Sequence, residues 1–347
     1  MTPPEENVST NPLKNDPTAE QRKQDHIELA FQSRITGQDI DDRFYYEPMV
    51  SAHPKELTPK AFLGKTMRAP IWISSMTGGT TSAGTINRNL AQACAEFGLG
   101  MGLGSCRALL DSDEFFEDFN LRPIIGPEQP FFANLGIAQV EQLLANGAGH
   151  KILALVNKLQ ADGLFIHVNP LQEWLQPEGD AINRSPIDTI EECLELGVKI
   201  IVKEVGQGMG PESLKALLQM PLAAIDFAAH GGTNFSKLEL LRDSEQKQQT
   251  YGQLAHMGHT AEEMVDFVNG LFAILGDKVK VEECIISGGV GNFLDGYYLM
   301  HKLRCNSVYG QGSAFLKHAQ GDYKALQEFV RYQIQGLQVA GAFLKVR

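Results

Sequence analysis

Eight short apolar or β-branched segments alternate with longer helical stretches along this chain, and that alternation restricts the possible fold more than any other feature. In chain order the segments lie at 70–74, 98–103, 130–134, 163–168, 199–203, 222–227, 283–287 and 306–310. Strands that alternate with helices form parallel sheets, because each helix crosses back over the sheet before the next strand begins. Eight such units within 347 residues fit one barrel with extensions. The sequence therefore predicts an α/β fold, a (β/α)8 barrel.

The remaining parts of the chain differ from these units in composition. Residues 1–19 are rich in Pro, Asn, Thr and Glu and nearly lack apolar residues, so burial cannot offset the entropy of ordering them, and we expect a disordered tail. From Glu20 the segment EQRKQDHIELAFQSR has apolar residues at helical spacing, which predicts a helix. We expect residues 20–347 to form a single domain, with an N-terminal extension over 20–68 and a polar insertion near 239–260.

Charge and composition exclude several classes of protein. The 30 basic and 42 acidic residues give a net charge of −12, the wrong sign for a nucleic-acid binder. The first residues lack the basic start and apolar centre of a signal peptide, and no apolar run approaches the roughly 18 residues that span a bilayer. The five cysteines are scattered without CxxC spacing, which favours neither disulfides nor a thiolate metal site. We expect a cytoplasmic protein that binds neither nucleic acid nor membranes.

Nearly every predicted strand ends in a polar cluster that contains glycine. In chain order these clusters read SSMTGG, LGSCR, NLG, HVNPLQE, KEVGQG, DFAAHGGTN, SGGVGN and GQGS. In an α/β barrel the carboxyl ends of all strands meet at one face, where active sites lie. The last two clusters, at 287–292 and 310–312, precede helical stretches, and their small residues can expose N–H groups at a helix N-terminus. We expect a phosphate group to bind there.

The strand GLFIHVN places polar side chains on one of its faces. Its alternation directs Phe165, His167 and Asn169 to the same side. Gln172 and Glu173 follow within six residues and add an amide and a carboxylate, ligands that suit a polar substrate or Mg²⁺. This density of polar groups favours a site over a single hydrogen-bonded core histidine.

Two cations follow other strands, and each has two interpretations. Lys203 ends an apolar strand, where an unpaired charge is costly. It pairs either with Glu204 or Asp226, or with a bound anion or an electron-rich cofactor ring, and the sequence does not decide between them. Arg107 is either a bidentate phosphate clamp or an ordinary surface arginine.

Taken in order, the motifs RKQDHI, SSMTGG, GSCR, ANLG, HVNPLQEWLQPEGD, VKEVGQG, GGTN and SGGVGN resemble the motif series of type 2 isopentenyl-diphosphate isomerases. The resemblance runs from about Arg22 to Leu316. It implies reversible conversion of isopentenyl diphosphate to dimethylallyl diphosphate, with reduced FMN as an acid/base participant and with Mg²⁺ and NAD(P)H required. It also implies a small diphosphate substrate and a homo-oligomer, either a tetramer or an octamer.

The same resemblance implies roles for matching positions. The residues implied to surround FMN are Ser75, Met76, Thr77, Ser105, Asn134, Lys203, Thr233, Gly288, Gly289, Gly291, Gln311 and Gly312. Those implied to hold the substrate are Arg22, Lys23, Ser105, Cys106, Arg107, His167, Asn169 and Gln172. His167, Asn169 and Gln172 are the implied catalytic positions, with Gln172 as a proton relay, and Glu173 is the implied Mg²⁺ ligand.

Three positions depart from the family pattern. Cys106 replaces a usual Gln, Phe235 stands where Trp is common, and VGNFLDGYY replaces a segment that is usually basic after the double glycine. One alternative function is that of an FMN-dependent 2-hydroxy-acid oxidase or dehydrogenase, which needs a catalytic His and an Arg clamp that SGGVGN does not supply. A non-catalytic flavin-binding protein is the other alternative, because fold alone does not establish an activity.

Overall fold

The structure, a computed structural model, describes residues 18–74 and 81–347. The tail expected over residues 1–19 lies almost wholly outside the described residues. The chain divides into two units, a larger one over Tyr45–Val346 and a smaller one that ends at Phe44 and includes Arg347. The smaller unit contains the predicted helix, α1 (Ala19–Leu29), which buries none of its residues, and a short 3-10 helix, η1 (Gly37–Asp39).

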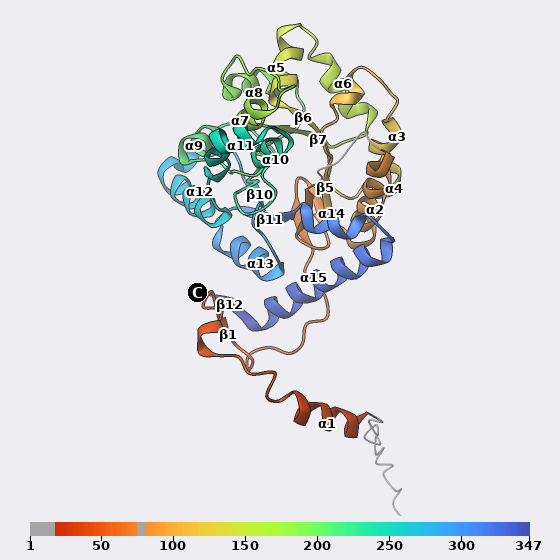
Figure 1. Ribbon diagram of the computed structural model, residues 1–347, viewed down its shortest axis with the longest axis vertical. Helices are drawn as coiled ribbons and strands as arrows, with labels where there is room; N and C mark the ends of the chain where they lie inside the picture. The colour runs from red at the N-terminus through yellow and green to blue at the C-terminus, as the bar shows by residue number, and fades with distance from the viewer. Residues whose placement is uncertain (1–17, 75–80) are drawn as a thin grey trace, which may run out of the picture. The chain divides into compact units, whose positions relative to one another are not determined.

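Eight parallel strands of the larger unit close into a barrel, so the predicted (β/α)8 fold is confirmed (Figure 1). Around the barrel the strands follow chain order, and the last pairs with the first. They are β4 (Ile71–Ser74), β5 (Gly100–Gly102), β6 (Phe131–Gly136), β7 (Gly163–His167), β8 (Ile200–Lys203), β9 (Ala224–Asp226), β10 (Glu283–Ser287) and β11 (Asn306–Gln311). Each overlaps one of the eight predicted segments.

Helices follow the strands in the order that a barrel requires. They are α2 (Thr81–Phe97), α3 (Phe116–Phe119), α4 (Arg122–Ile125), α5 (Ile137–Ala145), α6 (His150–Lys158), α7 (Pro170–Leu175), α8 (Pro186–Leu194), α9 (Pro211–Leu218), α10 (Phe235–Arg242), α11 (Glu245–Tyr251), α12 (Ala261–Leu275), α13 (Phe293–Lys302), α14 (Ser313–Ala319) and α15 (Tyr323–Phe343), the long blue helix in Figure 1. The 3-10 helices of this unit are η2 (Arg107–Leu110), η3 (Gly252–His256) and η4 (Gly276–Lys278). Among the described helices, none is long and apolar enough to cross a membrane.

Local sequence sets the helix ends, as α12 illustrates. Its first turn has a capping box, in which Thr260 Oγ1 accepts from the backbone N–H of Glu263 and the Glu263 carboxylate accepts from that of Thr260. The helix stops at Gly276, whose φ of 52° suits glycine far better than other residues. Its inner face buries apolar residues against the barrel.

A β-hairpin packs against the amino-terminal end of the barrel, and the sequence patterns do not predict it. Its strands are β2 (Lys60–Phe62) and β3 (Lys65–Met67). The turn residues Leu63 and Gly64 both have positive φ, 55° and 79°, as a two-residue hairpin turn requires. The hairpin side chains join the aromatic core of the barrel interior, in which Trp72 lies edge-on to Phe132 at 6.2 Å. Two further short strands, β1 (Phe44–Tyr46) and β12 (Leu344–Val346), lie outside the barrel.

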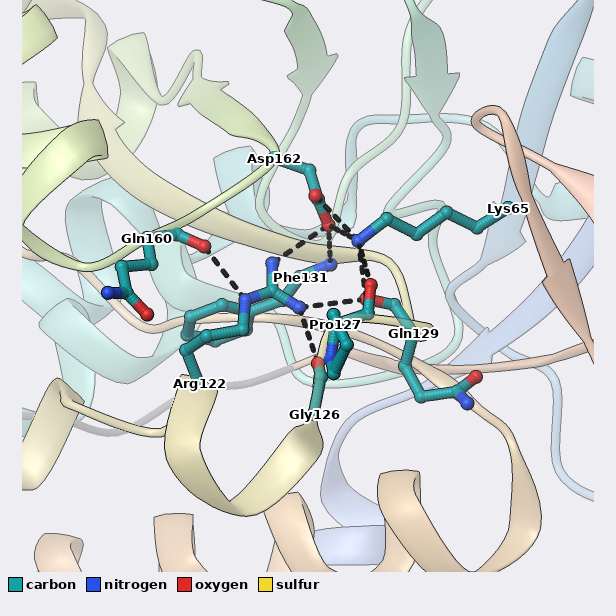
Figure 2. A network of polar contacts seen from close by, with 8 residues as sticks. All are labelled: Lys65, Arg122, Gly126, Pro127, Gln129, Phe131, Gln160 and Asp162. Carbon is teal, nitrogen blue, oxygen red and sulfur yellow. Dashed lines mark hydrogen bonds and ion pairs between the residues drawn. The ribbon is translucent and has the colours of Figure 1, made fainter.

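A charged network centred on Asp162 ties this hairpin to the barrel (Figure 2). The Asp162 carboxylate accepts from Lys65 Nζ at 2.7 Å, from an Arg122 Nη atom at 2.9 Å and from the backbone N–H of Phe131 at 2.9 Å. Three further guanidinium N–H groups of Arg122 donate to the carbonyl oxygens of Gln160, Gly126 and Gln129. Lys65 comes from β3, Arg122 from α4 and Phe131 from β6, so one carboxylate joins three elements.

Candidate active site

A cavity of about 430 Å³ opens at the carboxyl ends of the strands, between β8 and β4. Glycine-rich turns form most of its wall, at residues 231–233 after β9, 287–291 after β10 and 310–314 after β11. Its charged lining residues are Lys203, Asp226 and Lys317. The cavity thus lies at the face where the strand-end clusters predict a site.

The glycines at this wall are required by close approach of two turns. Gly231 has a φ of 113°, and a Cβ added there would lie 2.9 Å from the Cα of Gly289. Gly288 has a φ of 84°, and its Cβ would overlap the backbone of Ala229. Because backbone rather than side chains forms this wall, a flat ring or a phosphate can approach it closely.

Lys203 stands at the end of β8, opposite Asp226 in the register of β8 and β9. Asp226 accepts a short hydrogen bond from Ser287 Oγ, and Glu204 accepts from the backbone N–H groups of Gln207 at 2.5 Å and Gly208 at 3.1 Å. Both carboxylates that the sequence offers as partners for Lys203 are therefore held by other donors. Burial lowers the pKa of Lys203 and raises that of Asp226. Lys203 is thus a cation that a bound electron-rich or anionic group would stabilise.

His167 ends the neighbouring strand, paired with Lys203 in the register of β7 and β8. Asn134 Nδ2 donates to the carbonyl oxygen of Leu103 at 2.8 Å, so Asn134 Oδ1 faces the ring of His167, where it lies 2.8 Å from Nδ1. We therefore assign the proton of the neutral ring to Nδ1, which leaves Nε2 as an acceptor. Burial, and then the charge of Lys203, lower the pKa of His167 from 6.5 to about 3. The ring is therefore neutral near physiological pH, and Nε2 is its acceptor.

This pKa predicts a specific loss of stability in acid. From about pH 6.5 down to about pH 3 the unfolded chain binds a proton at His167 that the folded chain does not. The free energy of unfolding should therefore fall with falling pH, with at most about 1.4 kcal/mol per pH unit from this residue. His167→Gln keeps an N–H donor for Asn134 and should flatten that part of the profile, as measured by urea unfolding across the range. Equal slopes for the two proteins would show that His167 has a similar pKa when folded and unfolded.

Asn169 organises the polar residues that follow β7. It precedes α7, and its Nδ2 donates to Gln172 Oε1 at 3.1 Å and to Glu173 Oε1 at 3.0 Å. Gln172 Nε2 donates in turn to Glu239 Oε1 at 3.1 Å, and Arg242 holds the second oxygen of Glu239 at 2.5 Å. Asn169 Oδ1 is buried and has no hydrogen-bond partner among the described residues. An orphaned acceptor beside a carboxylate is suited to a ligand that supplies positive charge or a donor.

Asp180 links this cluster to Arg107. Its backbone N–H donates to Glu173 Oε2 at 2.8 Å, and its carboxylate accepts from Arg107 at 2.6 Å and from Gln139 at 2.9 Å. Arg107 remains about half exposed, so the ion pair holds it at the edge of the cluster without burying it. Both interpretations of Arg107 are compatible with this position.

The other predicted site residues are distributed as follows. Ser75, Met76 and Thr77 lie outside the described residues. Arg22 and Lys23 lie on α1 in the smaller unit, where both are exposed. Ser105 is exposed, whereas Cys106 is fully buried and its thiol donates to the carbonyl oxygen of Gly104 at 3.4 Å. Thr233, Gly288, Gly289, Gly291, Gln311 and Gly312 line the cavity, as does Phe235, one of the positions that depart from the family pattern.

Gln311 reaches the cavity wall but uses its side chain to support the fold. Its Nε2 donates to the carbonyl oxygen of Val290 at 2.9 Å, and its Oε1 accepts from Gln333 at 3.2 Å. It therefore braces the turn after β10 against β11.

The structure narrows one expectation for the turn after β10. Of the N–H groups predicted to be free before the next helix, α13, those of Gly291 and Asn292 are already occupied. The Asp295 carboxylate accepts from Gly291 and Asn292 at 3.0 and 3.2 Å, and the Asn292 side chain accepts from Leu294 and Asp295. This capping box uses the donors that an anion would otherwise bind.

Three residues of the site were not predicted from the sequence. Lys317 lines the cavity from the second turn of α14, and its only sequence signal is a lysine shortly after the last glycine turn. Glu239 and Arg242 belong to a stretch that reads as a polar insertion, and nothing in their spacing indicates that Glu239 contacts Gln172 or that Arg242 holds Glu239.

No model of a known protein family matches this chain. Solved structures with a similar fold include flavocytochrome b2 with sulfite bound, at TM-score 0.59 and 14% identity, covering 86% of this chain and 71% of that one. A mandelate oxidase with a monooxide FMN adduct matches at TM-score 0.52 and 10% identity, covering 88% and 89%. At these identities the similarity establishes the fold alone.

Curated relatives are closer in sequence. The chain is 33% identical over 331 residues to the isopentenyl-diphosphate delta-isomerase of Rickettsia felis, covering 92% of this chain and 91% of the relative. It is 34% identical over 294 residues to the enzyme of the same name from Pelodictyon phaeoclathratiforme, covering 79% and 80%. Similarity of this extent along both chains shows that this protein belongs to the isopentenyl-diphosphate delta-isomerase family.

Proposed function

We propose that this chain is a type 2 isomerase, which interconverts isopentenyl and dimethylallyl diphosphate with reduced FMN and Mg²⁺. The observation that carries the proposal is that the glycine-lined cavity and the polar cluster after β7 adjoin at the ends of two neighbouring strands. Lys203, at the wall of the glycine-lined cavity, pairs in register with His167, at the edge of the cluster of Asn169, Gln172 and Glu173. One surface suits a flavin, and the other suits a diphosphate with its metal.

The cavity residues fit FMN. The wall formed by Gly231, Gly288 and Gly289 is backbone that a planar ring can approach, and a Cβ at these positions would clash with the opposing turn. Ser74 Oγ at the same cavity is buried and has no partner in the described part of the chain, as expected of a group that awaits a ligand. Lys203 would then face the electron-rich ring, and Thr233 would lie beside it.

The cluster after β7 fits Mg²⁺ as an ion held through a single protein carboxylate. No group of three metal-binding side chains occurs among the residues that the structure describes. Mg²⁺ commonly binds through one or two carboxylates together with substrate phosphates and water. Glu173 would supply the carboxylate, and the orphaned Oδ1 of Asn169 would supply a hard oxygen close by.

The isomerisation adds a proton to the terminal alkene carbon and removes one from the saturated carbon next to the double bond, with no net redox change. When bound and reduced, FMN supplies acid/base chemistry next to the alkene. The chain's own residues would position the substrate: Arg107 would bind the diphosphate, Glu173 would hold the Mg²⁺ that offsets its charge, and His167 Nε2 would accept a hydrogen bond. Gln172, whose amide oxygen and nitrogen are both hydrogen-bonded, is the candidate relay for a proton.

We also propose NAD(P)H as the source of electrons that reduce the flavin, a cytoplasmic location and a tetrameric or octameric assembly. Substrate contacts from Arg22, Lys23, Ser105 and Cys106 belong to the same proposal.

The test is anaerobic conversion of isopentenyl diphosphate by the purified protein with FMN, Mg²⁺ and NADPH, with each component omitted in turn. We expect product only when flavin, metal and reductant are all present. Bound, reduced flavin without dimethylallyl diphosphate would contradict the proposal. Oxidation of a 2-hydroxy acid would favour the oxidase alternative, although the described residues that line the cavity include neither His nor Arg. Flavin binding without any turnover would favour a binding protein.

A further inference from the structure

The glycine-lined cavity has two cationic side chains among its described lining residues, and they come from separate elements, the strand β8 and the helix α14. Lys203 ends β8, and Lys317 follows β11, with β9 and β10 between them in the barrel. Lys203 is next to His167 and the polar cluster, and it faces the charge of Asp226. No carboxylate in the described part of the chain forms an ion pair with Lys317, which is exposed. Lys317 is therefore available to an anion at the far end of the cavity.

The turn after β10 makes that cation necessary if an anion binds there. Asp295 occupies the N–H groups of Gly291 and Asn292 and places a carboxylate next to the turn. The segment VGNFLDGYY contains no Lys or Arg to offset that charge. A phosphate beside this turn would meet a negative side chain and fewer free donors.

We propose that Lys317 neutralises the phosphate of FMN in this chain, in place of a basic residue after the double glycine. The inference rests on the proposed function, in which the cavity holds FMN. If the isoalloxazine ring bound beside Lys203, the ribityl chain would extend toward the turns after β10 and β11, which line the same cavity, and the phosphate would approach Lys317. The group recognised is a phosphate monoester dianion, and the interaction is charge pairing by a mobile ammonium group.

Comparing FMN with riboflavin isolates the contribution of the phosphate to binding, because riboflavin has the same ring and ribityl chain but no phosphate. We expect Lys317→Met to raise the Kd for FMN on the order of 3- to 10-fold, the range for a partly exposed charge contact, and to leave the Kd for riboflavin unchanged. Both constants are measured by quenching of flavin fluorescence on titration with protein. Added KCl should weaken FMN binding to the wild type more than to the variant.

Two further variants complete the design. Lys317→Arg keeps the charge and should retain FMN affinity. Lys324→Met removes the same charge from an exposed position near the start of α15 that does not line the cavity, and it should leave both constants unchanged. Riboflavin binding by Lys317→Met shows that the variant has folded.

The outcomes distinguish this inference from the proposed function. An unchanged FMN Kd in Lys317→Met, with normal flavin binding otherwise, overturns the role of Lys317 and leaves the isomerase proposal intact. Equal weakening of FMN and riboflavin also overturns it, because the residue would then act on the ring or the fold. Failure of the wild-type protein to bind either flavin overturns the proposed function itself.

Discussion

Asp162→Ala is expected to lower the free energy of unfolding by about 3–5 kcal/mol, the usual cost of removing one partner from a buried ion pair. The substitution leaves Arg122 and Lys65 without their shared carboxylate, and the side chain of Arg122 is only 9% exposed. It also removes the acceptor for the backbone N–H of Phe131, at the start of β6. Urea unfolding followed by circular dichroism measures the change.

An exposed ion pair provides the matched control. Asp111 pairs with Lys151 at 3.3 Å, and the two side chains are 85% and 42% exposed. Asp111→Ala should change the free energy of unfolding by less than about 0.5 kcal/mol, because water solvates and screens both charges. If Asp162→Ala costs no more than this control, the network in Figure 2 adds nothing to stability.

The barrel strands were predictable because they are buried on both faces. Segments such as 200–203 are then almost continuously apolar and end at a polar cluster, a pattern visible in a single sequence. The hairpin of β2 and β3 has three-residue strands that each include a lysine, so it has no such pattern. Asp162 looks like an ordinary loop residue, because its partner Lys65 lies 97 positions away and no local spacing records the contact.

The contacts of the candidate site likewise divide into those that the sequence predicts and those that it does not. Asn169, Gln172 and Glu173 meet because they lie three and four positions apart around one helix start, a relation readable from the sequence. Glu239 approaches Gln172 from 67 positions away, and only the folded chain reveals that. At the turn after β10 the relevant pattern is local, but the prediction did not use it. Asn292 and Asp295 have the spacing of a capping box, and this box occupies donors that were assigned to a phosphate.

Glu173→Gln is expected to lower Mg²⁺-dependent isomerisation on the order of 100-fold, equivalent to about 2.7 kcal/mol of transition-state stabilisation. The amide keeps the size of the side chain but loses the negative charge that would bind the metal. It also turns an NH2 group toward either Asn169 Nδ2 or the backbone N–H of Asp180, both of which are donors. Initial rates over a range of Mg²⁺ concentrations, together with flavin affinity, measure the effect.

Flavin affinity decides what a loss of turnover means. Glu173 lies after β7, whereas the described cavity lining comes from the turns after β8 to β11 and from Ser74 at the end of β4, so FMN affinity should stay at the wild-type value. Glu191→Gln, which removes the same charge from an exposed position on α8, should leave both quantities unchanged. If Glu173→Gln releases flavin as well, the carboxylate supports the fold that joins the two surfaces. If turnover falls while flavin stays bound, and excess Mg²⁺ restores part of the rate, the carboxylate acts through the metal. Mass action refills a weakened ion site at high Mg²⁺ concentration, but it does not restore a cluster of misplaced side chains.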